Sequence, residues 1–156
     1  MIGLRVPGRG RIALNHLVCD VNGTIALDGK LVDGVARSLR TLSDRLEIHL
    51  ITANTHGAQD LINHQLSLTA HLLQPDDEAS QKARFVESLG SESVVAIGQG
   101  ANDVDMLRTA ALGICVLSRE GAAAESLLAA DLVVPDILAA FELLEKPLRL
   151  IATMRK

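Results

Sequence analysis

Aromatic residues are scarce in this 156-residue chain, which contains no Trp, no Tyr and only two Phe, Phe85 and Phe141. A platform that stacks the bases of single-stranded nucleic acid needs several aromatic faces, so this class of binding protein is excluded. The formal net charge is −4 and the basic residues form no dense block. Binding through neutralised phosphates is therefore not expected either. We expect no nucleic-acid partner.

Cysteines and long apolar runs are also scarce. The two cysteines, Cys19 and Cys115, each lie inside a short apolar run, which predicts buried thiols in a reducing compartment. No run reaches the roughly 18 apolar residues of a membrane span. The basic segment 1–16 lacks the long apolar stretch of a secretory signal. We expect a cytoplasmic protein with no membrane partner.

Aliphatic residues are abundant. Hydrophobic residues make up 48% of the chain and aromatics only 1%, so the core must consist of Leu, Ile, Val and Ala. Such cores suit parallel sheets, whose strands are buried on both faces. The length fits one domain, and no repeat, low-complexity tract or linker interrupts it. Residues 1–156 are therefore expected to form a single domain.

Predicted strands alternate with predicted helices. A hairpin around Pro7–Gly10 is expected to join strands at 2–6 and 11–19, the second of which continues into the core, and a short hairpin is expected around Asp28–Gly29. A helix carries Val35, Leu39, Leu42 and Leu46 with Asp33 as its cap. Further strands are expected at 47–52, 70–74, 94–98, 113–117 and 132–134, and further helices at 56–66, 78–89, 102–111, 121–130 and from 137, with a break near Pro147. This alternation indicates a three-layer α/β/α sandwich, Rossmann-like, with a mostly parallel sheet.

Polar residues stand where several of these strands end. Asp20 ends the first core strand and Thr52 ends the next. Gln99, Asn102 and Asp103 follow the strand at 94–98, and Lys82 lies early in the preceding helix. Each has a common alternative, such as a helix cap or a solvated helix residue. Strand ends in a parallel sheet share one edge, and ligands bind at that edge. We therefore expect these groups to converge.

The order of these residues also resembles a known family. "DVNGT" from Asp20, "ITANT" containing Thr52, Lys82 and "GQGANDVDML" containing Asp103 are similar to the four motifs of the haloacid dehalogenase (HAD) superfamily, which includes phosphatases and P-type ATPases. The resemblance covers about residues 12–134. Two other families fit less well. A response-regulator receiver domain has its phosphorylated Asp after the third strand, whereas Asp20 ends the first core strand, and a dinucleotide-binding domain has a glycine fingerprint after the first strand, which this chain lacks.

The resemblance implies a role for each residue. The catalytic set would be Asp20, the nucleophile that forms an aspartyl-phosphate, with Asn22, Thr52 and Lys82. The phosphate of a small phosphorylated substrate would be held by Gly23, Thr24, Thr52, Ala53, Asn54 and Lys82. The cofactor would be Mg²⁺, held by Asp20, Asn22 through its backbone carbonyl, Gln99 and Asp103. These oxygen ligands suit Mg²⁺, and phosphoryl transfer depends mainly on positioning and charge stabilisation.

Two residues depart from the family pattern. Asn22 stands where the phosphatases usually carry an Asp that protonates the leaving group, and an amide cannot transfer that proton. General acid–base help is worth about 10²–10⁴-fold, so slow turnover is expected. Gln99 stands where an Asp usually binds the metal, so weaker Mg²⁺ binding is expected. The alternative is a non-catalytic HAD-fold sensor or partner-binding protein.

The chain has no room for the cap domains found in this family. Residues 24–33 allow only a flap and residues 52–82 only a helix and a strand, so the chain resembles capless sugar-acid phosphatases and, slightly more, soluble relatives of P-type ATPases. An open site favours a homo-oligomer, a dimer or tetramer. Arg119 could contact substrate or lie on the surface. No transition-metal site is expected, because the histidines are scattered: His16, His49, His56, His64 and His71.

Overall fold

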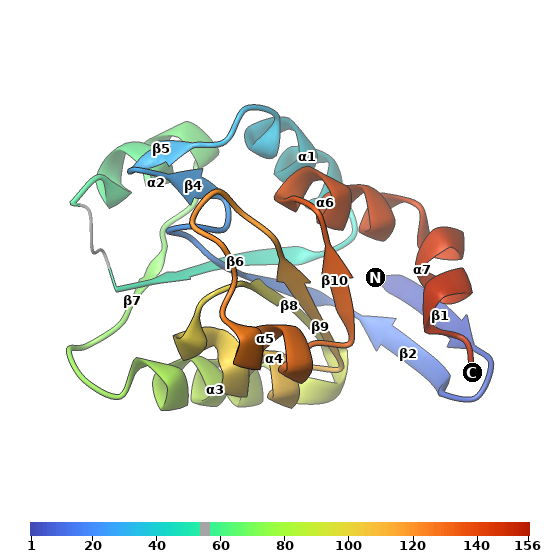
Figure 1. Ribbon diagram of the computed structural model, residues 1–156. Coiled ribbons are helices and arrows are strands. Elements are labelled where there is room, and N and C mark those ends of the chain that lie inside the picture. Colours follow the sequence, from blue (N-terminus) through green and yellow to red (C-terminus); the bar gives the residue numbers. More distant parts are fainter. Residues whose placement is uncertain (54–56) are drawn as a thin grey trace.

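The computed structural model describes residues 1–53 and 57–156 (Figure 1). Its centre is a six-stranded sheet in the order β10-β9-β8-β3-β6-β7, with every neighbouring pair parallel. The strands are β3 (His16–Asp20), β6 (Glu47–Thr52), β7 (His71–Leu72), β8 (Val94–Gly98), β9 (Leu112–Val116) and β10 (Leu132–Val134). The predicted α/β fold with a parallel sheet is confirmed.

Two antiparallel hairpins flank this sheet. The first pairs β1 (Ile2–Val6) with β2 (Gly10–Leu14), and the second pairs β4 (Ala26–Leu27) with β5 (Lys30–Leu31), as expected. The strand expected to continue from β2 into the sheet is divided at Asn15. The backbone of Asn15 bonds to Ser93 and Glu47 and so leads the chain into the sheet.

Helices cover both faces of the sheet. They are α1 (Val35–Leu42), α2 (Gln59–Leu66), α3 (Glu78–Ser88), α4 (Val104–Thr109), α5 (Ala124–Ala129), α6 (Ile137–Glu145) and α7 (Pro147–Met154), with 3₁₀ turns at Ser91–Ser93 and Ala101–Asp103. Figure 1 shows α3, α4 and α5 on one face and α1 and α6 on the other, while α7 packs against β1. The result is the expected three-layer arrangement.

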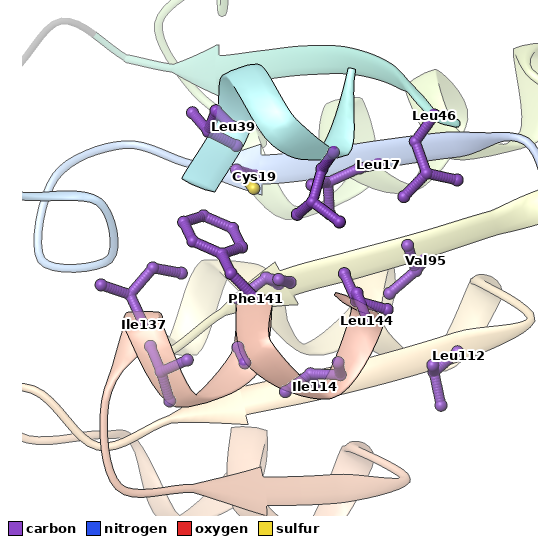
Figure 2. Packing of buried hydrophobic residues seen from close by; sticks show 14 of the residues in the cluster. Leu17, Cys19, Leu39, Leu46, Val95, Leu112, Ile114, Ile137, Phe141 and Leu144 are labelled. Atoms are coloured by element: carbon purple, nitrogen blue, oxygen red, sulfur yellow. The ribbon is translucent and has the colours of Figure 1, made fainter. Parts of the chain in front are cut away.

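The core is aliphatic, as predicted. On the α1 and α6 side, Phe141 and Leu144 pack among strand residues such as Leu17 and Ile114 (Figure 2). A second cluster, under α3, α4 and α5, includes Val18, Ile51, Val94, Ala96 and Met106. Because both faces are covered, β8 and β9 are buried along their whole length. These rigid strands fix the residues at their ends.

Several predicted helix boundaries are wrong. The residue before α1 is Gly34, whose φ of 91° is costly for other residues, and Asp33 does not cap the helix. α1 ends at Leu42, although Leu46 is still buried in the same core. The helix expected at 102–111 begins as a 3₁₀ turn, because the Asp103 carboxylate bonds back to the loop before it. The start expected at residue 56 lies outside the described residues.

The two places where a cap domain could be inserted hold little chain. The β4–β5 hairpin lies between β3 and α1, and α2 and β7 are the elements that the described residues form between β6 and α3. None of the described helices is long and apolar enough to cross a membrane.

Candidate active site

The polar residues predicted to converge do so at the carboxyl edge of the sheet. Asp20 is the last residue of β3, Thr52 is the last of the neighbouring β6, and Gln99 follows β8 on the other side of β3. Lys82 reaches the same edge from the first half of α3. Parallel strands in register bring their carboxyl ends side by side, which is why residues far apart in sequence meet here.

Three buried charges form the centre of the site. The ammonium Nζ of Lys82 donates to Asp20 Oδ1 at 2.9 Å and to Asp103 Oδ1 at 2.7 Å. The three residues are only 1%, 7% and 0% exposed, respectively. Thr24 Oγ1 donates to Asp20 Oδ2 at 3.0 Å, and Asp103 Oδ2 accepts the backbone N–H groups of Gln99 and Gly100, both at 2.9 Å. The site is therefore held rigidly.

The balance of charge in this site is negative, since two carboxylates share one ammonium. Burial and then the neighbouring Asp103 raise the pKa of Asp20 from 3.8 to about 7, although Lys82 acts to lower it. Burial by itself would lower the pKa of Lys82, but the two carboxylates more than offset this, so its pKa lies above its ordinary value. Lys82 stays charged, and Asp20 lacks a full counterion.

Asn22 and Thr52 line a small cavity beside these charges. Asn22 Nδ2 donates to Thr52 Oγ1 at 3.2 Å. The cavity has a volume of about 100 Å³ and is lined by Asp20, Asn22, Thr52, Ala53, Glu78, Lys82, Gln99, Gly100 and Asn102. Its walls combine hydrogen-bond donors, an ammonium and carboxylates. That combination suits the reacting group of a phosphorylated molecule.

The remaining predicted site residues lie around this cavity. Thr24 bonds to Asp20, and Asp103 lies behind Lys82. Gly23 has a φ of 78°, and a Cβ there would come within 2.1 Å of Gln99 Nε2 and 2.2 Å of Glu120 Oε2, so any other residue would adopt a costly φ and displace both side chains. Asn54, expected to hold phosphate, lies outside the described residues.

Two cavity residues, Glu78 and Asn102, were not assigned a role from sequence. Asn102 Nδ2 donates to Glu78 Oε2 at 2.7 Å, and Asn102 Oδ1 accepts from Lys82 at 3.3 Å. Glu78 precedes Lys82 by four residues on α3, and this spacing puts both on one face of a helix. The helical spacing could therefore have identified Glu78.

A larger hollow adjoins the site. Its volume is about 420 Å³, and Gly23 and Thr24 belong to its wall. Hairpin residues Ala26 and Leu27 line one side, and the segment from Val116 to Arg119 and the residues Pro135–Ile137 line the rest. The β4–β5 hairpin thus borders this hollow, as expected of a flap.

The donor set of the small cavity fits Mg²⁺. Asp20 and Glu78 supply carboxylates to the cavity wall, and Asp103 adds a third negative charge directly behind the one ammonium, that of Lys82. Gln99 donates Nε2 to Glu120 at 3.5 Å, so its carbonyl oxygen is the atom that could face a cation. Both Asp103 oxygens accept hydrogen bonds from protein donors, which favours a contact to the metal through water.

The prediction that the histidines are scattered is wrong for His16 and His49. Their rings meet at the opposite, amino edge of the sheet, with Nδ1 of His16 3.2 Å from Nε2 of His49. Glu47 lies beside both. Pairing of β3 with β6 makes this cluster, which helical spacing cannot reveal. His56 lies outside the described residues.

Comparison with known proteins identifies relatives and a fold. No family model matches the chain. The uncharacterized protein MJ0073 of Methanocaldococcus jannaschii is 43% identical over 82 residues, which are 50% of this chain and 88% of that protein. The uncharacterized protein MJ0072 of the same organism is 46% identical over 39 residues, 25% of this chain and 89% of that protein.

Solved structures with the same fold are more distant in sequence. A Legionella pneumophila protein assigned to HAD superfamily (subfamily III A) hydrolases superposes with a TM-score of 0.69 at 20% identity, covering 90% of this chain and 87% of that one. The cobalt-bound deoxy-D-mannose-octulosonate 8-phosphate phosphatase of Haemophilus influenzae superposes with a TM-score of 0.70 at 12% identity, covering 85% of this chain and 88% of that one. The Moraxella catarrhalis 3-deoxy-D-manno-octulosonate 8-phosphate phosphatase, in complex with magnesium, phosphate and KDO, superposes with a TM-score of 0.67 at 18% identity. The match covers 91% of this chain and 94% of that one. The chain therefore belongs to the same family as MJ0073 and has the fold of the haloacid dehalogenase (HAD) superfamily.

Proposed function

We propose that this protein is a Mg²⁺-dependent phosphohydrolase that works through an aspartyl-phosphate on Asp20. The observation that carries the proposal is the position of Asp20 at the end of β3, bonded to the buried Lys82 and facing a small polar cavity. The fold shared with HAD phosphatases supports it.

The reaction would proceed in two displacements. A carboxylate oxygen of Asp20 attacks phosphorus, and the bond from phosphorus to the leaving oxygen breaks. Lys82 and Thr52 neutralise and orient the phosphoryl oxygens, which are the main tasks in phosphoryl transfer. Water then attacks the phosphoryl group, releases phosphate and restores the Asp20 carboxylate. Mg²⁺, held by Asp20, the Asn22 carbonyl, Gln99 and Asp103, would screen the negative charges that otherwise repel each other.

Asn22 should make turnover slow. Its side chain donates to Thr52 and has no proton to transfer to a leaving group at neutral pH. Leaving groups that need no protonation, such as those of acyl and aryl phosphates, should therefore be favoured over alkyl phosphates. Glu78 is the other carboxyl group in the cavity wall and is the second candidate for proton transfer.

A phosphatase panel with and without Mg²⁺ tests this function. It should include an acyl phosphate, p-nitrophenyl phosphate and an alkyl phosphate, and we expect Mg²⁺-dependent release in that order of rate. Asp20→Asn keeps the shape of the side chain but is a far weaker nucleophile, so it should abolish release. Turnover that survives Asp20→Asn would contradict the proposed nucleophile.

The second candidate is a non-catalytic sensor or partner-binding protein. Lys82 already pairs both carboxylates without a metal, which would suit a site that holds phosphate without turning it over. This function predicts binding of inorganic phosphate, no turnover of any panel member and no rescue by Asn22→Asp.

The finer features of the enzyme remain proposals. We infer that its substrate is a small phosphorylated molecule whose leaving group enters the larger hollow beside the hairpin. The capless site supports a homo-oligomer, and light scattering that returned only the 16.6 kDa monomer would contradict it. A cytoplasmic location, a single domain and a particular likeness to P-type ATPases stay predictions, the first supported by two free, buried cysteines.

A further inference from the structure

A second polar cluster lies at the amino edge of the sheet, away from Asp20. His16 is the first residue of β3 and pairs directly with Glu47, the first residue of β6. His49 follows Glu47 by two residues, so it points to the same face of the sheet. The parallel register therefore brings two imidazoles and one carboxylate together.

The separations between the donor atoms match those around a metal ion. His16 Nδ1 lies 3.2 Å from His49 Nε2 and 3.3 Å from Glu47 Oε2, and His49 Nε2 lies 3.9 Å from Glu47 Oε1. Zinc binds histidine and carboxylate at about 2.0–2.2 Å, so two ligands of a tetrahedral ion lie about 3.3 Å apart. Only the Glu47 carboxylate, the most exposed of the three side chains, needs to move closer.

The surroundings hold the rings in place and leave one side open. The side chains of His16 and His49 are only 20% and 15% exposed, whereas that of Glu47 is 68% exposed. Phe85 of α3 meets His49 edge-on, with centroids 5.6 Å apart, and stacks on His71 at 4.7 Å.

We propose that His16, Glu47 and His49 bind a divalent transition-metal ion of the Zn²⁺ or Co²⁺ type, with solvent completing its coordination. Imidazole ligands suit these ions, whereas Mg²⁺ prefers oxygen. The site is distinct from the one around Asp20, because four residues of extended strand, about 13 Å, separate His16 from Asp20. A bound ion would join the amino ends of β3 and β6 and stabilise the sheet that carries the catalytic residues.

Titration of the tag-free full-length protein with Co²⁺ and Zn²⁺ alone tests the site. With excess Mg²⁺ present to occupy the proposed site around Asp20, we expect one equivalent of Co²⁺ to bind with visible d–d absorption, Zn²⁺ to displace it, and the thermal midpoint to rise on binding. His16→Ala and His49→Ala should each weaken the affinity by at least about 10-fold, since each removes a ligand. Asp20→Asn should leave Co²⁺ binding at this site unchanged.

Two further variants keep the outcome interpretable. Glu47→Gln alters an exposed side chain and removes the charged ligand while keeping the fold, so it should also weaken binding. His64→Ala, at an exposed position on α2, is the matched control and should bind like the wild type. Equal Co²⁺ affinity in the wild type, Glu47→Gln and the histidine variants would overturn the proposal, as would a loss of Co²⁺ binding caused by Asp20→Asn alone.

Discussion

The two ends of strands β3 and β6 carry polar clusters of opposite design. At the carboxyl ends, Asp20, Asp103 and Lys82 are buried charges, and the chain supplies the cation itself. At the amino ends, His16 and His49 are partly buried rings beside an exposed carboxylate, and no ammonium or guanidinium group is described in this cluster. The carboxyl end combines the charges that the proposed phosphate and Mg²⁺ site requires, whereas the amino end has the nitrogen atoms that the proposed transition-metal site requires.

The difference shows how strand register builds sites of unlike chemistry from the same two strands. Asp20 lies beside Ile51 in the pairing of β3 and β6, and His16 lies beside Glu47 four steps earlier. Neither cluster is contiguous in sequence. Energetic coupling within each cluster should therefore be strong, and coupling between the two ends should be weak.

Removing Lys82 should have the largest effect on stability. Lys82→Met leaves two buried carboxylates without their cation, which typically costs about 3–5 kcal/mol of unfolding free energy. Urea denaturation at neutral pH measures this loss of unfolding free energy, with Lys30→Met on the exposed hairpin as the control. At the other end, His49→Gln should cost much less. If His49→Gln lowered the free energy of unfolding more than Lys82→Met does, the two ends would not differ as described.

Placing an acid at residue 22 should increase the rate of phosphate hydrolysis at the carboxyl end. Asn22→Asp should raise alkyl-phosphate turnover by roughly 10²-fold, because a positioned acid can then protonate the leaving group. Steady-state kinetics measure it, and Asn22→Ala is the control for simple loss of the bond to Thr52. If Asn22→Asp gives no gain while Glu78→Gln removes activity, Glu78 supplies the proton instead.

The pH dependence of stability should expose the uncompensated charge on Asp20. Its pKa is raised from 3.8 to about 7 on folding, so the folded state holds a proton that the unfolded state has released. The metal-free protein should therefore lose stability as pH rises between these values, by up to about 4 kcal/mol. Denaturation at pH 5 and pH 8 measures it. Burial lowers the pKa of His49, which adds stability as pH rises in both proteins, so the wild type is compared with Asp20→Asn. A wild type that loses no more stability over this interval than Asp20→Asn would contradict the prediction.

Substituting Gln99 should give the smallest effect and should separate the two metals. Gln99→Asp supplies a carboxylate in place of an amide oxygen, so Mg²⁺ affinity should rise about 10-fold, measured by calorimetry. Co²⁺ binding at the amino end should not change. An unchanged Mg²⁺ affinity would place Gln99 outside the coordination sphere.

The sequence predicted that the polar residues at the carboxyl end come together, for a physical reason. Parallel βαβ topology places strand ends together, so Asp20, Thr52 and Lys82 could be expected to meet before any contact was known. The sheet itself followed from continuous aliphatic runs such as Val94–Gly98. Helix boundaries were less predictable, because the cap at Gly34 depends on backbone geometry and not on a side chain.

Contacts set by register were not predictable. The meeting of His16 with His49 depends on which residue of β3 lies opposite which residue of β6, and a shift of one step would place His49 on the other face. Likewise, the approach of Glu120 to Gly23 depends on how the loop after β9 folds over the site.

The ammonium of Lys82 also bears on the order in which this protein is assembled. A cation attached to the chain is present from the first moment of folding, at a concentration that no dilution can lower. The protein can therefore fold around Asp20 and Asp103 before any metal ion binds, and a metal that enters later would meet a preformed site. Chelators should thus remove the Mg²⁺-dependent activity without unfolding the protein, and added Mg²⁺ should restore the activity without a refolding delay.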